Sequence, residues 1–246
     1  FIDGFGGMTQ GLFATLIIGT MIQQIGLLIG SSTGNVIYLL GKAAAALTSA
    51  GIGVGVAVKY GESPLVTVSA AVAAMVGGYA GKITGGTFFV DGNAVLAGPG
   101  EPLGAFIAAF AGITCGHLVS GKTKVDIIVT PVITIGAGSV VGLLVGPPIS
   151  QMMTGLGSII NWATEQRPFI MGIVVSVVMG MVLTLPISSA ALGIILNLSG
   201  LAAGAATIGC CCNMVGFAVA SYRENKFGGL VAQGLGTSML QVPNIM

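Results

Sequence analysis

Glu101 has the most distinctive chemical setting in this sequence. It lies in the segment GPGEPLG (98–104), between two prolines and at the start of an uncharged apolar run over 102–121. Glycine and proline here exclude a helix interior, and the run predicts a helix whose N-terminus faces the carboxylate. A carboxylate held in this way can accept two hydroxyl hydrogen bonds from a polar ligand. Two interpretations stay open: a ligand contact, or an N-terminal cap at the membrane surface.

His117 is the sole histidine of the chain. It can act as a proton relay or a ligand donor. It precedes Lys122 by five residues, so a hydrated helix end is an equally good interpretation. One histidine makes no metal site, and no Ser/His/Asp or Cys/His set for nucleophilic catalysis is recognisable. We expect no metal, no cofactor and no enzymatic activity.

Neutral polar side chains gather around Pro186 and in the last segment. The candidate solute ligands among them are Ser188, Ser189, Asn197, Gln233 and Thr237. Hydroxyl and amide groups without charge suit a polyhydroxylated solute better than an ion. Each of them can instead form an interhelical hydrogen bond.

The segment GHLVSGKT (116–123) fits the G-x-x-x-x-G-K-[ST] pattern of nucleotide-binding loops. Such a loop must follow a buried strand and open a helix, whereas an apolar stretch of membrane length precedes it here. We interpret it as a cytoplasmic loop with retained lysines.

The elements that position these groups are predicted to be membrane helices. Only 6% of the 246 residues are charged, against roughly 25% in a soluble domain, and the mean hydropathy is +1.02. The few basic residues form no cluster, which excludes nucleic acid as a partner. A spanning helix needs about 20 apolar residues, so the uncharged gaps predict seven to nine apolar segments in a lipid bilayer. We expect helices near 11–31, 35–58, 65–81, 102–119, 127–147, 168–185, 189–204, 206–220 and 229–242.

Prolines and glycines predict how these helices break and pack. Pro147 and Pro148 should end one helix, and Pro186 should divide another, which predicts broken or re-entrant segments around a polar cavity. Small residues every four positions predict close helix packing. They are Gly26, Gly30 and Gly34, and then Gly138, Gly142 and Gly146.

The predicted fold is therefore all-α: a polytopic transmembrane helical bundle with broken or re-entrant helices. We expect one domain over 1–246, truncated at both ends, because the chain starts at Phe1 and stops within an apolar stretch. Retention of basic loops on the inner side predicts a cytoplasmic location for one set of residues. They are Lys59, Lys122, Lys124, Arg223 and Lys226.

Several long stretches also carry a family resemblance. They are GPGEPLGAFIA (98–108), SGKTKVDIIVTP (120–131), NWATEQRPFIMGIVVSVVMGM (161–181), LPISSAA (185–191) and SYRENKFGGLVAQGLGTSMLQVPNI (221–245). The sequence resembles the second enzyme IIC family of the bacterial phosphotransferase system, which includes membrane proteins of the perfringolysin O regulator type. The pattern Gly98-x-x-Glu101-Pro102 is also similar to the G-x-x-E-P tip of glucose-type enzyme IIC proteins, which implies a sugar contact for Glu101.

The resemblance implies a membrane permease for a sugar or sugar-like solute, in the bacterial cytoplasmic (inner) membrane. In such a system soluble enzyme IIA and IIB parts deliver phosphate through His and Cys, and these parts are not found in the chain. They can be separate proteins, or this member moves its solute without phosphorylating it, or it senses the solute. We also expect a homodimer. The alternative function is a membrane sensor or regulator that retains the permease fold without transport.

Overall fold

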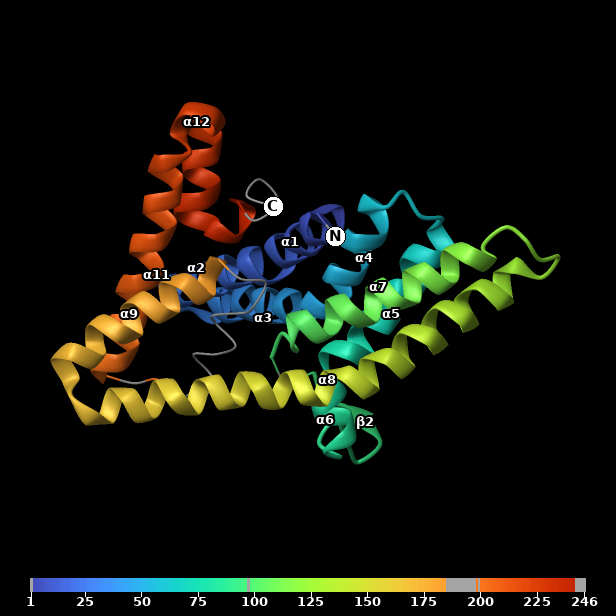
Figure 1. Ribbon diagram of the computed structural model, residues 1–246, viewed down its shortest axis with the longest axis horizontal. Helices are drawn as coiled ribbons and strands as arrows, with labels where there is room; N and C mark the ends of the chain where they lie inside the picture. Colours follow the sequence, from blue (N-terminus) through green and yellow to red (C-terminus); the bar gives the residue numbers. More distant parts are fainter. Residues whose placement is uncertain (1, 97, 185–197, 199, 242–246) are drawn as a thin grey trace. The chain divides into compact units, whose positions relative to one another are not determined.

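The computed structural model describes residues 2–96, 98–184, 198 and 200–241 (Figure 1). Its contacts divide the chain into two compact units, Phe1–Ser150 and Gln151–Met246.

The first unit is built from helices and one short hairpin. Its elements are α1 (Ile2–Leu12), the π-helix η1 (Phe13–Ile17), α2 (Ile18–Ile29), α3 (Ser32–Ala46), α4 (Thr48–Lys59), α5 (Pro64–Gly78), α6 (Ala80–Thr84), the antiparallel strands β1 (Phe89–Val90) and β2 (Asn93–Ala94), α7 (Pro102–Val119) and the first part of α8 (Asp126–Gln166). Helix α5 packs on α7 and α4, α1 packs on α4, and α2 packs on α3. The core they bury is made largely of alanine, glycine and valine, which allow the backbones to approach closely.

The second unit continues α8 and adds shorter elements. They are α9 (Pro168–Thr184), α11 (Gly200–Ala220), α12 (Tyr222–Val231), the π-helix η2 (Ala232–Gly236) and the 3₁₀-helix η3 (Ser238–Gln241). Helix α11 packs on α9, and η2 lies against α11 and α12. A single helix over Gly200–Ala220 replaces the predicted division near residue 205.

Apolar helices of membrane length confirm the predicted fold class. Four segments are long and apolar enough to span a membrane: Asp3–Ile29, Pro102–Val119, Asp126–Met152 and Gly200–Ala220. The pair α3 and α4 makes a fifth candidate, and α5 and α9 are shorter apolar helices. The chain is thus a multi-pass membrane protein with an all-α fold.

Proline does not end α8 where we predicted. Helix α8 continues through Pro131, Pro147 and Pro148, so the predicted end at residue 147 is wrong. A proline removes one backbone hydrogen bond and crowds the preceding turn, but membrane helices tolerate this loss when neighbouring groups satisfy the released carbonyl. The predicted division at Pro186 lies outside the described residues.

The broken span that the structure does contain has no proline at its break. Helices α3 and α4 meet at Leu47 with a bend of 54°, where Leu47 adopts φ −88° and ψ 10°. The Thr48 hydroxyl donates to the carbonyl of Ala45 (2.6 Å) beside the bend. The structure therefore contains a broken span, as the predicted fold class requires, but the single helix predicted over 35–58 is wrong.

Glycines allow the predicted close approach of helix backbones, although the first set, Gly26 to Gly34, spans two helices and not one. Gly30 has φ +61° and ends α2, so Gly26 and Gly34 lie on two antiparallel helices. A Cβ added to Gly26 would lie 2.7 Å from the carbonyl oxygen of Gly34. On α8, a Cβ added to Gly142 would lie 2.8 Å from the Cα of Gly77. Both contacts leave no room for a side chain.

Candidate functional site

Three interruptions of helical structure meet inside the first unit. The first is the bend at Leu47, and the second is Tyr79, which separates α5 from α6 with φ −106° and ψ 11°. The third is the loop over residues 98–101, which precedes α7. Backbone groups at such breaks lose intrahelical partners, so the side chains around them must supply hydrogen bonds.

Hydrogen bonds tie these interruptions to one another. The Tyr79 hydroxyl bridges the carbonyls of Ala46 (3.1 Å) and Gly98. The Ser49 hydroxyl donates to the carbonyl of Pro99 (3.0 Å). Burial raises the pKa of Tyr79 to about 12, so this hydroxyl keeps its proton and stays a donor. The loop over 98–101 is therefore held by side chains that come from two other helix breaks.

Glu101 is the last residue of this loop and the N-cap of α7. Its backbone N–H donates to the carbonyl of Gly78 (2.7 Å), and its Oε1 accepts a long hydrogen bond from the N–H of Leu103 (3.5 Å). The buried Pro102 starts the helix, where a missing N–H has no consequence. These local signals agree with the prediction that Glu101 precedes a helix.

Electrostatics make the Glu101 carboxyl unusual. It is partly buried and precedes the span Pro102–Val119. Burial raises the pKa of Glu101 from 4.5 to about 7, and the hydrogen bond from Leu103 opposes this rise. The carboxyl can therefore be neutral or ionised near neutral pH, unlike an exposed glutamate.

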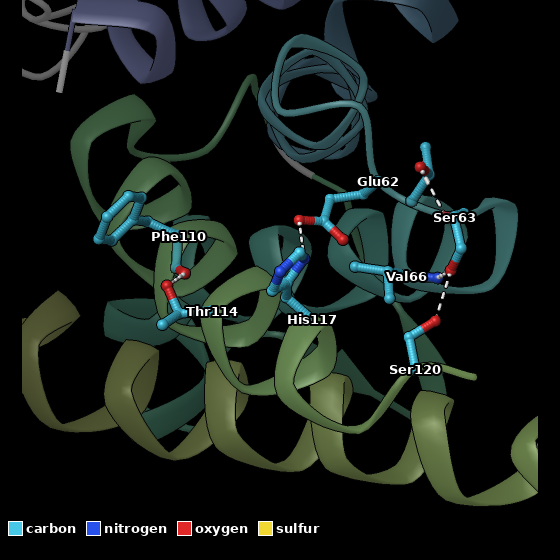
Figure 2. A network of polar contacts seen from close by, with 8 residues as sticks. Glu62, Ser63, Val66, Phe110, Thr114, His117 and Ser120 are labelled. Carbon is cyan, nitrogen blue, oxygen red and sulfur yellow. Dashed lines mark hydrogen bonds and ion pairs between the residues drawn. The ribbon is translucent and has the colours of Figure 1, made fainter. Parts of the chain in front are cut away.

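His117 lies near the other end of the same helix (Figure 2). Its Nδ1 is 3.0 Å from Oε1 of Glu62, and the histidine side chain is 70% exposed. At about 1.5 Å per residue, the separation of 16 positions between Glu101 and His117 corresponds to about 24 Å. The structure does not bring these two candidates together, so one small solute cannot contact both in this arrangement.

A pair of serine hydroxyls lies beside the contact between His117 and Glu62 (Figure 2). Ser63 caps α5, and its Oγ lies 3.0 Å from Oγ of Ser120, the residue that follows α7. The two contacts connect the turn after α4 to the C-terminal end of α7. These contacts are hydrogen bonds of the kind that satisfy polar groups at helix ends.

The segment over 116–123 forms the end of α7 and the turn that follows. The N–H of Gly121 donates to Oδ1 of Asp126 (2.9 Å), which also accepts from the Thr130 hydroxyl (2.6 Å). A helix precedes the segment, where a nucleotide-binding loop requires a strand. Its geometry is that of a turn between two helices, with Lys122 exposed.

The remaining candidates belong to the second unit. Gln233 is buried in η2, and its Oε1 accepts from the Ser221 hydroxyl (3.2 Å). Thr237 is buried directly after η2. Ser188, Ser189 and Asn197 lie outside the described residues. In the described part of the chain, no group of three or more His, Cys, Asp or Glu residues is placed to hold a metal ion.

Sequence reasoning missed Ser49 and Tyr79. Both are hydroxyl residues in apolar surroundings, and their partners are 50 residues away for Ser49, and 33 and 19 residues away for Tyr79. Each lies at or beside a helix break, but the composition of these segments does not reveal the breaks, so the sequence held no usable signal for either residue.

Comparison with known proteins identifies the family. No curated protein and no solved structure gives a significant match. The family model described as phosphotransferase system, EIIC, matches residues 2–246, which is nearly the whole chain. The chain therefore belongs to the EIIC family, the membrane components of the phosphotransferase system.

Proposed function

We propose that this protein is the permease component of a sugar phosphotransferase system and that it binds its solute at Glu101. The observation that carries the proposal is the partly buried carboxyl of Glu101 at the meeting point of three helix interruptions. Irregular backbone at membrane depth occurs where it is packed in protein or lines an aqueous cavity, and transporters build their binding sites from such segments.

The chemistry of a carboxylate suits a sugar. Two oxygens can accept from two neighbouring hydroxyl groups, and each hydrogen bond to a charged group contributes about 1.5–3 kcal/mol. The pKa of Glu101 near 7 lets hydroxyl donors shift the group to its ionised form on binding. Gln233 and Thr237 offer further neutral groups, and so do Ser188, Ser189 and Asn197. We retain the groups of the second unit as separate proposals for solute contacts. His117 is an alternative to Glu101 and not a partner in the same contact, because about 24 Å of α7 separates the two.

We propose that the chain transports its solute and catalyses no reaction itself. Soluble enzyme IIA and IIB proteins would deliver the phosphoryl group, and the membrane would be the bacterial cytoplasmic membrane. We also propose a homodimer, which the mass of the purified protein in detergent tests. A sensor that binds the solute without moving it is the competing function.

Binding and uptake of labelled sugars test the proposal. A panel of ¹⁴C-labelled hexoses, amino sugars and hexitols is offered to the purified protein and to right-side-out membrane vesicles, which are loaded with or without phosphoenolpyruvate and the host's soluble phosphotransferase proteins. We expect one class to bind and to accumulate as its phosphate. Glu101→Gln should lower the affinity at least tenfold, whereas Glu62→Gln at the other end of α7 should leave it unchanged.

Each other outcome has a defined meaning. Binding without accumulation under any condition would support the sensor. Equal affinity in wild type and Glu101→Gln would remove the proposed contact from Glu101 and leave the polar groups of the second unit as candidates. Absence of binding by every class would contradict a sugar as the solute.

The orientation is testable independently. Val125 and Tyr222 are exposed neighbours of the basic residues that we place on the cytoplasmic side. Cysteines introduced at these positions, in a chain without its native cysteines, should resist an impermeant thiol reagent added outside intact cells. Labelling of both from outside would reverse the orientation.

A further inference from the structure

The loop that carries Glu101 is held by hydroxyl groups from outside the loop. Ser49 is 0% exposed and Tyr79 is 1% exposed. Ser49 donates to the carbonyl of Pro99, and Tyr79 donates to the carbonyl of Gly98. Buried hydroxyls are almost always hydrogen-bonded, and here both donate to consecutive carbonyls of one short loop.

The backbone of the loop is adapted to this contact. Gly100 has φ +77°, which L-residues rarely adopt, and a Cβ at this position would collide with Oγ of Ser49. The next residue, Glu101, donates its N–H to the carbonyl of Gly78, which directly precedes Tyr79. Contacts from α4 and from the α5/α6 junction therefore hold backbone groups of residues 98, 99 and 101.

We propose that Ser49 and Tyr79 are positioning residues, which fix the Glu101 carboxyl for its contact with the solute by holding the carbonyls of Pro99 and Gly98. A side chain held before binding loses less freedom when the ligand arrives, so affinity rises without new contacts. The statement that this positioning serves solute binding rests on the proposed function, whereas the hydrogen bonds are present whatever the function.

The same contacts connect the loop to the bend between α3 and α4. Tyr79 reaches the carbonyl of Ala46 as well as that of Gly98, and Ser49 lies in the first turn of α4. A change in the bend would therefore move the donors that hold the loop. The position of Glu101 depends on this bend as well as on its own helix.

Two conservative substitutions with matched controls test the inference without any sugar. Tyr79→Phe and Ser49→Ala each remove one hydroxyl. Tyr60→Phe removes a hydroxyl from a tyrosine that packs on Phe110, and Ser120→Ala removes one that bonds to Ser63 at the opposite end of α7. Either test variant suffices if the other does not fold.

The first measurement is amide hydrogen exchange of the purified protein. In both test variants we expect the amides of Gly100 and Glu101 to exchange at least tenfold faster, with residues 106–116 of α7 unchanged. The controls should leave residues 98–101 as in wild type. Equal acceleration throughout the first unit would indicate a general loss of stability and would overturn the positioning role.

The second measurement is the infrared titration of the Glu101 carboxyl, identified by the band that Glu101→Gln removes. Water reaching a loosened loop should lower the pKa of Glu101 from about 7 toward 4.5 in the test variants, and not in the controls. An unchanged titration in both test variants would overturn the inference. Because no sugar is present, that result would leave solute binding at Glu101 to the uptake experiment.

Discussion

Replacing Glu101 by glutamine should remove a specific pH dependence of stability. Burial raises the pKa of Glu101 from 4.5 to about 7. Between these values the folded chain holds a proton that the unfolded chain has released, so the free energy of unfolding falls as the pH rises. The stability that the neutral carboxyl contributes is fully present below about pH 4.5 and is lost as the pH rises through about 7.

The size of this effect follows from the change in pKa. A tenfold change in the ionisation constant is about 1.4 kcal/mol, so a rise from 4.5 to about 7 amounts to at most about 3 kcal/mol. Glu101 keeps some contact with solvent, and solvent screening reduces this figure to about 1–2 kcal/mol. For a chain of this length each kcal/mol moves Tm by about 2–4 °C, so the expected difference is about 2–8 °C.

Thermal unfolding of the purified protein in detergent between pH 4.5 and 8 measures this difference. Wild type and Glu101→Gln should unfold at similar temperatures at pH 4.5, and the variant should be the more stable one at pH 8. Glu224→Gln serves as the control because it removes an exposed carboxyl in the second unit. Parallel pH profiles for wild type and Glu101→Gln, or a wild type that gains on the variant as the pH rises, would refute the reasoning.

Three further outcomes are expected. Gly100→Ala should lower Tm more than Gly86→Ala. Both glycines have positive φ, which costs an L-residue about 1–2 kcal/mol of strain, but a Cβ at Gly86 would meet nothing within 4 Å. Equal losses of Tm would contradict the contact at Gly100. Gly142→Ile should lower the free energy of unfolding by about 1–3 kcal/mol through overpacking. Gly136→Ile, at a position where a Cβ has open space, should lower it by about 0.5 kcal/mol or less. Tm and the yield of folded protein measure both effects. The affinity for the identified sugar should rise from pH 6 to pH 8 in wild type, because its hydroxyls favour the ionised Glu101, and should not change with pH in Glu101→Gln; an affinity that rises as the pH falls would exclude the ionised form as the binding form.

The sequence alone was sufficient to predict a helical membrane protein. An ionisable group costs several kcal/mol at membrane depth, so long uncharged runs have a clear physical meaning. The start of α7 was also predictable, because the glycines and prolines around Glu101 act on their own backbone. Close helix packing at Gly138, Gly142 and Gly146 followed from the absence of side chains at regular spacing.

The positions of the helix breaks depended on tertiary contacts. Pro147 and Pro148 lie within α8, whereas α3 and α4 bend at Leu47 without a proline. A proline in the sequence shows that one helical hydrogen bond is lost, but the groups packed around it decide whether the helix continues. Glu101 and His117 lie at opposite ends of α7, which the helix predicted over 102–119 already implied.

The holding of the Glu101 loop was decided by the tertiary structure alone. Ser49 and Tyr79 contact residues 98 and 99 because the packing of α4, α5 and α7 brings distant segments within hydrogen-bond distance. Hydrophobic patterning specifies which segments enter the membrane, since it depends on each residue's own transfer free energy. The pairing of a hydroxyl with one particular carbonyl depends on how the helices pack, and that geometry exists only once the chain has folded.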